Sequence, residues 1–464
     1  MQYMTLEKIY SYKKYTYLEL ISMSDIVFRL LRKKIKKRNK IKLGSKKSNK
    51  IDRKLKNKRH PYGSSFVKRS TNELVRCMKP FHSSEILDSL NRKRDIKNWL
   101  HGNKRKKTIN DVMSINNFSF IDNPENTLEY FSKLAEYEPY VKELTINFSD
   151  DSVLDIAPYL LFGIIQKDMY PFISGGKIKS GITHVIEKLT LDKFMGIEVE
   201  PHYINPNVNA LPLAYKPVRD QSCKIAVTTL EVEVTRLIQK IDEWLSKLEH
   251  PMMLTDEGKV YVQTFSSEIL DNAQRHSIKD KEGNWYMAGF MEHRDDKYSC
   301  CLSFVNTGEP IYRTIMNTEN KDVAEDLHSY LNKHKNINDS ILATVFALQD
   351  GSTRQNYNGS KGGVGMMKMV KFVNEIGETE DDFKPVIAIL TGNAYIKFSD
   401  DYRNVQNNSK GQHIQWFNDT QSADFPPDKK HAFLLKNYFP GTIITTRFLL
   451  DDKTLRKKLK NDIN

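Results

Sequence analysis

The chain has 464 residues, 39% of them hydrophobic, and a formal net charge of +14 at pH 7, so it is long enough for two or three domains with a core in each. Its four cysteines, Cys77, Cys223, Cys300 and Cys301, include no CxxC pair, which excludes a disulfide framework and fits a reducing cytoplasm. Because no apolar run reaches the roughly 18 residues of a membrane helix, and the start lacks the apolar core of a signal peptide, we expect a soluble cytoplasmic protein without a membrane span.

Positive charge is concentrated in one N-terminal segment. From Arg29 to Arg69 there are nineteen Lys or Arg residues and a single acid, Asp52. Such a block repels itself and buries little apolar surface, which predicts a basic, partly helical N-terminal arm over residues 1–110. The arm could be merely solvated, or it could bind a nucleic acid through phosphate contacts that weaken as salt rises. Both interpretations stay open.

Residues 117–200 alternate between strand and helix patterns, which is typical of a small α/β domain. We expect strands at Phe118–Ile121 and Lys142–Phe148 and helices at Thr127–Tyr137 and Val153–Gln166. The segment from Glu143 to Ala157 resembles the strand, loop and helix start of STAS domains, which include anti-sigma-factor antagonists. Those antagonists carry a phosphoacceptor serine beside an aspartate, whereas Asp155 is followed here by Ile156 and Ala157. The resemblance therefore implies an unphosphorylated scaffold.

A proline-rich stretch, residues 201–228 with Pro206, Pro212 and Pro217, is predicted to connect this domain to the C-terminal half. After it, Leu230–Leu248 has apolar residues at helical spacing, including Leu237, Ile241 and Leu245. This stripe predicts a helix that packs on a sheet or pairs with a second copy in a homodimer.

Glu268, Asn272 and His276 lie four residues apart, so a helix places them on one face. A Mg²⁺-nucleotide site can use such a stripe. The neutral oxygen of Asn272 suits a hard cation, and Glu268, one turn earlier, can orient or deprotonate a water or hydroxyl. The same pattern also fits a solvated helix face.

Further segments follow in a fixed order. A hairpin is predicted over Trp285–His293 and Tyr298–Val305, and it runs into Asn306 and a tight turn at Gly308. Next come a helix at Asp322–His334 and a glycine-rich segment, Gly359 to Gly365, that opens an apolar helix. A buried final strand is expected at Phe439–Phe448.

Together these segments resemble the ATP-binding domain shared by histidine kinases, Hsp90, type II topoisomerases, MutL and the anti-sigma-factor serine kinases, the GHKL superfamily. The resemblance covers about half of the chain and implies a Bergerat α/β sandwich over residues 229–450, with a mixed, mainly antiparallel sheet. The overall prediction is therefore an α/β protein with a basic arm, a small α/β domain, this C-terminal domain and a basic tail at 451–464.

By position, the resemblance implies ATP and Mg²⁺ as cofactors. Glu268 matches the general base and Asn272 the Mg²⁺ ligand, while Asn306 would accept the adenine amino group and Thr442 would lie near the adenine edge. The remaining matches are in the glycine boxes, where backbone N–H groups approach phosphates and a lysine supplies charge: Gly308, Lys361, Gly362, Gly363 and Gly365. The sequence departs twice: most members have Asp where Asn306 stands, and Pro310 replaces a glycine.

Three functions remain open at this point. The first is an ATP-binding switch that hydrolyses ATP slowly and acts on a protein partner. The second is a serine/threonine kinase of the anti-sigma-factor type acting on a STAS-like partner. The third is a non-enzymatic adaptor that binds nucleic acid through Arg29 to Arg69. A self-phosphorylating histidine kinase is disfavoured, because Leu230–Leu248 contains no histidine.

Overall fold

The structure is a computed structural model that describes residues 84–94, 110–138, 141, 143–169, 173–189, 191–192, 207–218, 225–276, 283–294, 297–350, 352, 365–377, 384–450 and 455–457. The predicted basic stretch Arg29 to Arg69 lies outside these ranges, as do Lys361, Gly362 and Gly363 and the side chain of Asn272. The described part is a mixed α/β fold with antiparallel sheet and helices on both faces. None of its helices combines the length and hydropathy of a membrane span.

The central element is a five-stranded sheet in the order β4-β6-β7-β11-β8, in which every neighbouring pair is antiparallel. Its strands are β4 (Val208–Val218), β6 (Gly283–Arg294), β7 (Lys297–Asn306), β8 (Val386–Phe398) and β11 (Ala432–Leu449). A smaller parallel sheet has the order β1-β2-β3, formed by Asn110–Ile115, Glu143–Phe148 and Ile173–Lys177. Two short antiparallel pairs complete the strands, β5 (Met252–Leu254) with β12 (Leu455–Lys457) and β9 (Gln406–Asn407) with β10 (His413–Ile414).

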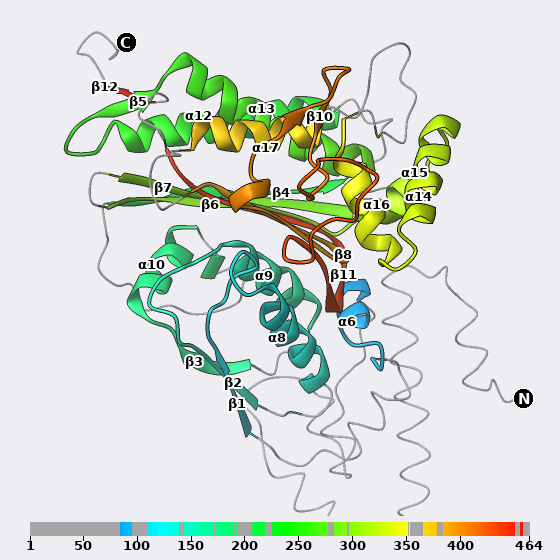
Figure 1. The fold of residues 1–464 in the computed structure, drawn as a ribbon. Coiled ribbons are helices and arrows are strands. Elements are labelled where there is room, and N and C mark those ends of the chain that lie inside the picture. The colour runs from blue at the N-terminus through cyan, green and yellow to red at the C-terminus, as the bar shows by residue number, and fades with distance from the viewer. Residues whose placement is uncertain are drawn as a thin grey trace, which may run out of the picture.

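Helices cover both faces of the five-stranded sheet (Figure 1). On one face lie α12 (Ile225–Leu245), α13 (Asp256–His276) and α17 (Gly365–Ile376), whose apolar residues share a core with Phe304 and Ile389 of the sheet. On the other face lie α8 (Pro124–Tyr137), α9 (Ala157–Asp168) and α10 (Ser180–Lys188), which with β1-β2-β3 form the α/β unit. Four more helices, α6 (Glu85–Leu90), α14 (Ile311–Met316), α15 (Lys321–Lys333) and α16 (Asp339–Leu348), complete the described helices of four residues or more.

Several elements predicted from the sequence are confirmed. The hairpin is β6–β7, the helices at 127–137, 230–248 and 322–334 are α8, α12 and α15, and the strand at 142–148 is β2. In β2, Leu144, Ile146 and Phe148 are buried and alternate with half-buried residues, as a strand with one covered face requires. The apolar helix after the glycine-rich segment is α17, and the final strand lies within β11.

The predicted strand Phe118–Ile121 is wrong, because these residues form a turn and the strand lies earlier, in β1. Phe118 and Ile121 are buried in the core, so their apolar character does not reflect strand pairing. Carboxylates satisfy the backbone instead: Phe118 N–H donates to Asp150 at 2.9 Å and Phe120 N–H donates to Asp155 at 2.8 Å. Likewise the predicted helix start at Val153 is too early, since Asp155 accepts from Ala157 N–H at 3.0 Å and α9 begins there.

Part of the predicted connector 201–228 is also wrong, because residues 208–218 form β4, an edge strand of the five-stranded sheet. Two prolines, Pro212 and Pro217, lie in this strand. Proline cannot donate to a ladder, so sheets accept it at edges and bulges. Both conditions hold here, since the pairing with β6 shifts register between Leu211 and Ala214. The sheet therefore begins before residue 229.

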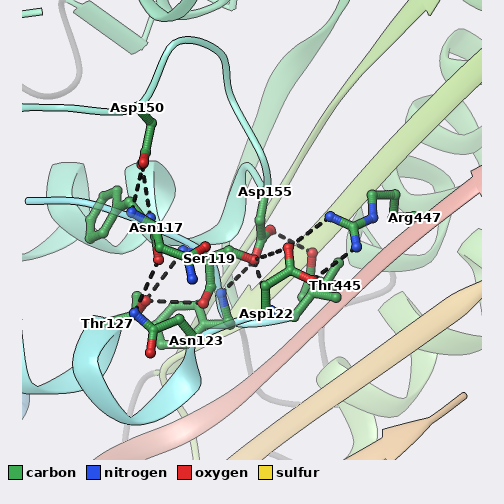
Figure 2. A network of polar contacts seen from close by, with 12 residues as sticks. Asn117, Ser119, Asp122, Asn123, Thr127, Asp150, Asp155, Thr445 and Arg447 are labelled. Atoms are coloured by element: carbon green, nitrogen blue, oxygen red, sulfur yellow. Dashed lines mark hydrogen bonds and ion pairs between the residues drawn. The ribbon is translucent and has the colours of Figure 1, made fainter.

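A buried polar network joins the α/β unit to the sheet (Figure 2). Asp155 precedes α9 and is 0% exposed. Its Oδ1 accepts from Thr445 Oγ1 of β11 at 2.6 Å and from Ser303 Oγ of β7 at 3.4 Å. Beside it, Arg447 of β11 holds Asp122 with two parallel bonds of 2.8 and 2.9 Å. One carboxylate thus fixes the loop before α9 to two strands, and a second fixes the turn before α8.

These two carboxylates predict opposite pH dependences of stability. Burial raises the pKa of Asp155 above its ordinary value of 3.8, against the opposing hydrogen bonds from Thr445, Ala157 and Phe120. Its contribution to the stability of the fold is therefore fully present below the pKa of the unfolded state and is lost as pH rises through the pKa of the folded state. For Asp122, burial on its own would raise the pKa, but the hydrogen bonds and positive charge of Arg447 outweigh it and lower the pKa below its ordinary value. That contribution is present above the unfolded pKa and is lost as pH falls.

We expect the stability difference between the native protein and Asp155→Asn to shrink as pH rises from acid to neutrality. The corresponding difference for Asp122→Asn should grow over the same range. Urea unfolding at a series of pH values measures both differences. A pH-independent difference for Asp155→Asn would contradict the assignment.

Candidate functional site

A row of four side chains crosses the five-stranded sheet at one level. Asn306, the last residue of β7, pairs with Trp285 of β6 on one side and with Thr442 of β11 on the other, and Thr442 pairs with Thr391 of β8. We call these residues the polar row. Two residues along each strand, Met287, Phe304, Ile444 and Ile389 belong to the core beneath α12, α13 and α17. Because side chains two residues apart share a face, the polar row faces the helical layer.

The predicted residues Asn306, Gly308 and Thr442 are therefore brought together. Asn306 Oδ1 accepts from Gly308 N–H at 2.6 Å and closes the turn that follows β7. Thr391 Oγ1 lies 3.0 Å from Thr442 Oγ1 and accepts from Ile311 N–H at 2.7 Å. The loop after β7 is consequently fastened at both ends, by Asn306 at its start and by Thr391 at its finish.

Pro310, the departure from the glycine box, has a structural role in this loop. It stands immediately before α14 with φ −60° and ψ 148°, and its carbonyl accepts from the N–H groups of Arg313 and Thr314. The proline ring fixes φ near this value. The residue therefore ends the turn and begins the helix at Ile311.

Gly441 allows β11 to approach the end of β7 closely. Its φ is +156°, and a Cβ at this position would lie 2.0 Å from the carbonyl oxygen of Asn306. The pairing of β11 with β8 shifts register between Phe439 and Thr442, at the same place. A side chain at residue 441 would push Asn306 away from Thr442.

The helical layer contributes the other predicted positions. Glu268 is half-buried on α13, one turn after Phe265, whose ring meets Phe304 of β7 edge-on at a centroid distance of 5.6 Å. Asn272 lies on the same helix, one turn further, and its side chain is outside the described residues. Gly365 is the first residue of α17, which packs along α13. Glu268 and Gly365 thus belong to the layer that the polar row faces (Figure 1).

Sequence reasoning missed two members of the polar row, Thr391 and Trp285. Thr391 lies in an apolar run whose end at Gly392, with φ +63°, interrupts regular strand geometry. Trp285 is 1% exposed, and its Nε1 has no hydrogen-bond partner among the described residues. Their positions follow from register, which a single sequence leaves open.

The described part of the chain contains no cluster of three His, Cys, Asp or Glu residues arranged to hold a metal ion. The polar row consists instead of amide, hydroxyl and indole groups, which donate and accept hydrogen bonds without adding charge. The fold and the polar row define a mixed α/β protein whose antiparallel sheet carries a row of neutral polar side chains beneath a helical layer. Comparison of the chain with family models, curated proteins and solved structures gives no match.

Proposed function

We propose that the protein binds Mg²⁺-ATP between the polar row and the layer of α13 and α17, and that it acts as an ATP-dependent switch on a protein partner. The observation that carries this proposal is the pairing of Asn306 with Thr442 in register on the face that the helices cover. The two residues come from distant parts of the sequence, and the GHKL resemblance implies that both contact the nucleobase. A sheet covered on this face by helices also fits the sandwich that the GHKL resemblance implies.

The residues of the row have the chemistry that a nucleobase edge needs. Asn306 Oδ1 accepts a hydrogen bond from Gly308 N–H, and an amide oxygen is the kind of acceptor with which a base amino group pairs. The Thr442 hydroxyl lies beside Thr391, so the two can orient one hydroxyl hydrogen toward a ring nitrogen. Bound ATP would supply a transferable γ-phosphoryl group, with Mg²⁺ balancing its charge.

The helical layer would serve the phosphates. Gly365 opens α17, and a helix N-terminus favours an anion. Gly362, Gly363 and Lys361 directly precede it in sequence and would supply backbone donors and a cation. Asn272 would hold Mg²⁺, and Glu268, half-buried one turn before it, would take the proton of the attacking water.

A serine/threonine kinase is the second candidate, and one contact bears on its substrate. Asp155, at the position that the STAS resemblance places beside a phosphoacceptor, is enclosed between α9 and the sheet. The aspartate is therefore not accessible to a kinase site, although Ser149 and Ser152 in the loop before it are exposed, and we propose that a STAS-like substrate would be a separate protein. The nucleic-acid adaptor rests on Arg29 to Arg69, outside the described residues.

Two variants test the proposed switch. Asn272→Ala should weaken Mg²⁺-ATP binding by at least about tenfold, since it removes the cation ligand. Glu268→Ala should keep the affinity and slow phosphate release by roughly 10²–10⁴-fold, the usual contribution of a general base. Calorimetric titration and a phosphate-release assay with γ-labelled ATP measure these effects.

Unchanged affinity in Asn272→Ala would overturn the binding site. Binding without phosphate release in the native protein, together with label transfer to an added STAS-like protein, would favour the kinase. Thermal melting of each variant controls for loss of fold.

A further inference from the structure

A pocket of about 780 Å³ lies where α6, α14, α16, β8 and β11 meet, and no residue of the polar row lines it. Its volume is within the range of small-molecule sites in proteins. None of the residues proposed for Mg²⁺-ATP lines it. The pocket therefore requires its own explanation.

Two arginines from different walls face this pocket, and neither forms an ion pair within the described ranges. Arg92 follows α6, and Arg313 lies on α14. Arg313 Nε donates to Tyr312 Oη at 3.2 Å, and its guanidinium lies 5.8 Å from the ring centre of Tyr438. These contacts leave the terminal N–H groups of Arg313 for another partner.

One of the two carboxylates in the lining already pairs with another arginine. Asp88 of α6 binds Arg94 at 2.5 Å, and the Arg94 side chain is fully buried and also holds Glu138 at 3.0 Å. Asp88 is therefore already paired with one arginine outside the pocket lining, and a single carboxylate cannot neutralise Arg92 and Arg313 as well. Asp339, at the start of α16, is the other acid of the lining.

The start of α16 adds further donors. Asn338 Oδ1 accepts from Ser340 N–H at 2.9 Å and from Ser340 Oγ at 2.6 Å, so the amide oxygen is occupied and the NH₂ group keeps its donors. Asn393 of β8 lies on the other side of the same hydroxyl, with its side-chain amide 3.4 Å from Ser340 Oγ. Two guanidinium groups and two side-chain amides thus line one pocket at the positive end of a ten-residue helix.

The remaining wall is aromatic and apolar. Tyr312 and Tyr438 pack against Gly392, where a Cβ would lie 2.8 and 3.1 Å from their rings. Because glycine has no side chain, the two rings can lie this close to the backbone. Met316 beside them is 47% exposed. This wall can receive a planar or apolar group, and the Asp339 carboxylate can accept from hydroxyls.

We propose that this pocket binds an organic phosphate the size of a nucleoside monophosphate. The phosphate lies between Arg92 and Arg313, whose planar forks match its oxygens, and the amides of Asn338 and Asn393 donate to the same end. The sugar hydroxyls face Asp339, and the organic part extends along Tyr312 and Met316. The proposal is independent of Mg²⁺-ATP binding at the polar row.

The test is calorimetric titration of the full chain with AMP, glucose 6-phosphate, adenosine and inorganic phosphate. An organic phosphate should bind, and Arg313→Gln should weaken that binding by at least about tenfold, the loss of a charge-assisted pair. Tighter binding of AMP than of glucose 6-phosphate would identify a nucleotide, and the reverse order a sugar phosphate. Arg236→Gln, on an exposed turn of α12 where Arg236 lies 3.7 Å from Glu233, is the matched control and should change nothing.

Three outcomes would overturn the proposal: no binding of either organic phosphate, equal affinity in Arg313→Gln, or adenosine binding as tightly as AMP. The two proposed sites are distinguished by a cross-test. Arg313→Gln should leave Mg²⁺-ATP affinity intact, and Asn272→Ala should leave the Arg313-dependent binding intact. Because Arg313 is exposed, its replacement should not unfold the chain, and thermal melting verifies this.

Discussion

Asp155→Ala is expected to lower the free energy of unfolding by about 3–5 kcal/mol, since it removes the shared acceptor of several buried donors. Phe120 N–H, Ala157 N–H and Thr445 Oγ1 donate to this carboxylate at 2.8, 3.0 and 2.6 Å. The substitution leaves these buried donors without their acceptor. The donors come from the turn before α8, the first turn of α9 and β11, so the loss affects both sides of the interface.

Urea unfolding of Asp155→Ala beside Asp151→Ala measures this effect. Asp151 is a neighbouring aspartate whose side chain is 91% exposed and pairs with Lys179 at 2.6 Å. An exposed pair of this kind contributes less than about 1 kcal/mol. Equal losses in the two variants would show that the buried network does not join the α/β unit to the sheet.

The same two strands connect this network to the candidate site. Ser303 and Thr445 lie on the face of the sheet toward the α/β unit, with their hydroxyl oxygens 2.8 Å apart. Asn306 and Thr442 lie three residues along β7 and β11, on the opposite face. A displacement of either strand end would therefore change the geometry both of the polar row and of the hydrogen bonds to Asp155. The α/β unit is in this sense a structural support for the site.

The sequence was informative where a pattern has one structural solution. The apolar alternation of 142–148 requires a strand with one covered face, and Leu144, Ile146 and Phe148 are buried in β2 as expected. The hairpin was recognisable because two apolar runs flank a short polar link. Asn306 and Thr442 were recognisable because each stands at a fixed place in a motif, after a strand and after a glycine.

The failures occurred where tertiary contacts decide between local alternatives. The side chains of Phe118 and Phe120 are buried in the core, which explains the apolar pattern without a strand. Their backbone N–H groups donate to side-chain carboxylates instead of to a neighbouring strand. Prolines 212 and 217 indicated a connector, but an edge strand with a bulge accepts both. Thr391 acquires its place in the polar row only through the register of β8 with β11, which no local pattern encodes.

Gly441→Ala is expected to disrupt the end of the β7–β11 pair and the polar row with it. The added Cβ would lie 2.0 Å from the Asn306 carbonyl oxygen and 2.9 Å from the ring of Phe439, so backbone must move. The φ of +156° alone costs a residue other than glycine about 1–3 kcal/mol, and the collision adds to that cost. We expect Gly441→Ala to lose more stability than the positive φ alone would cost. If the polar row forms the nucleobase site, the variant should also lose Mg²⁺-ATP binding.

Gly175→Ala separates the two contributions, because Gly175 has φ +151° and nothing lies within 4 Å of its Cβ position. This control carries nearly the same conformational cost without the collision, and β3 lies in the other sheet. Urea unfolding of both variants therefore gives the cost of the collision by difference. A Gly441→Ala protein no less stable than Gly175→Ala would mean that β7 and β11 are not held as closely as their register requires. If the row does bind the nucleobase, Gly175→Ala should also keep the native affinity for Mg²⁺-ATP, since β3 pairs with β2 and not with the strands that carry the row.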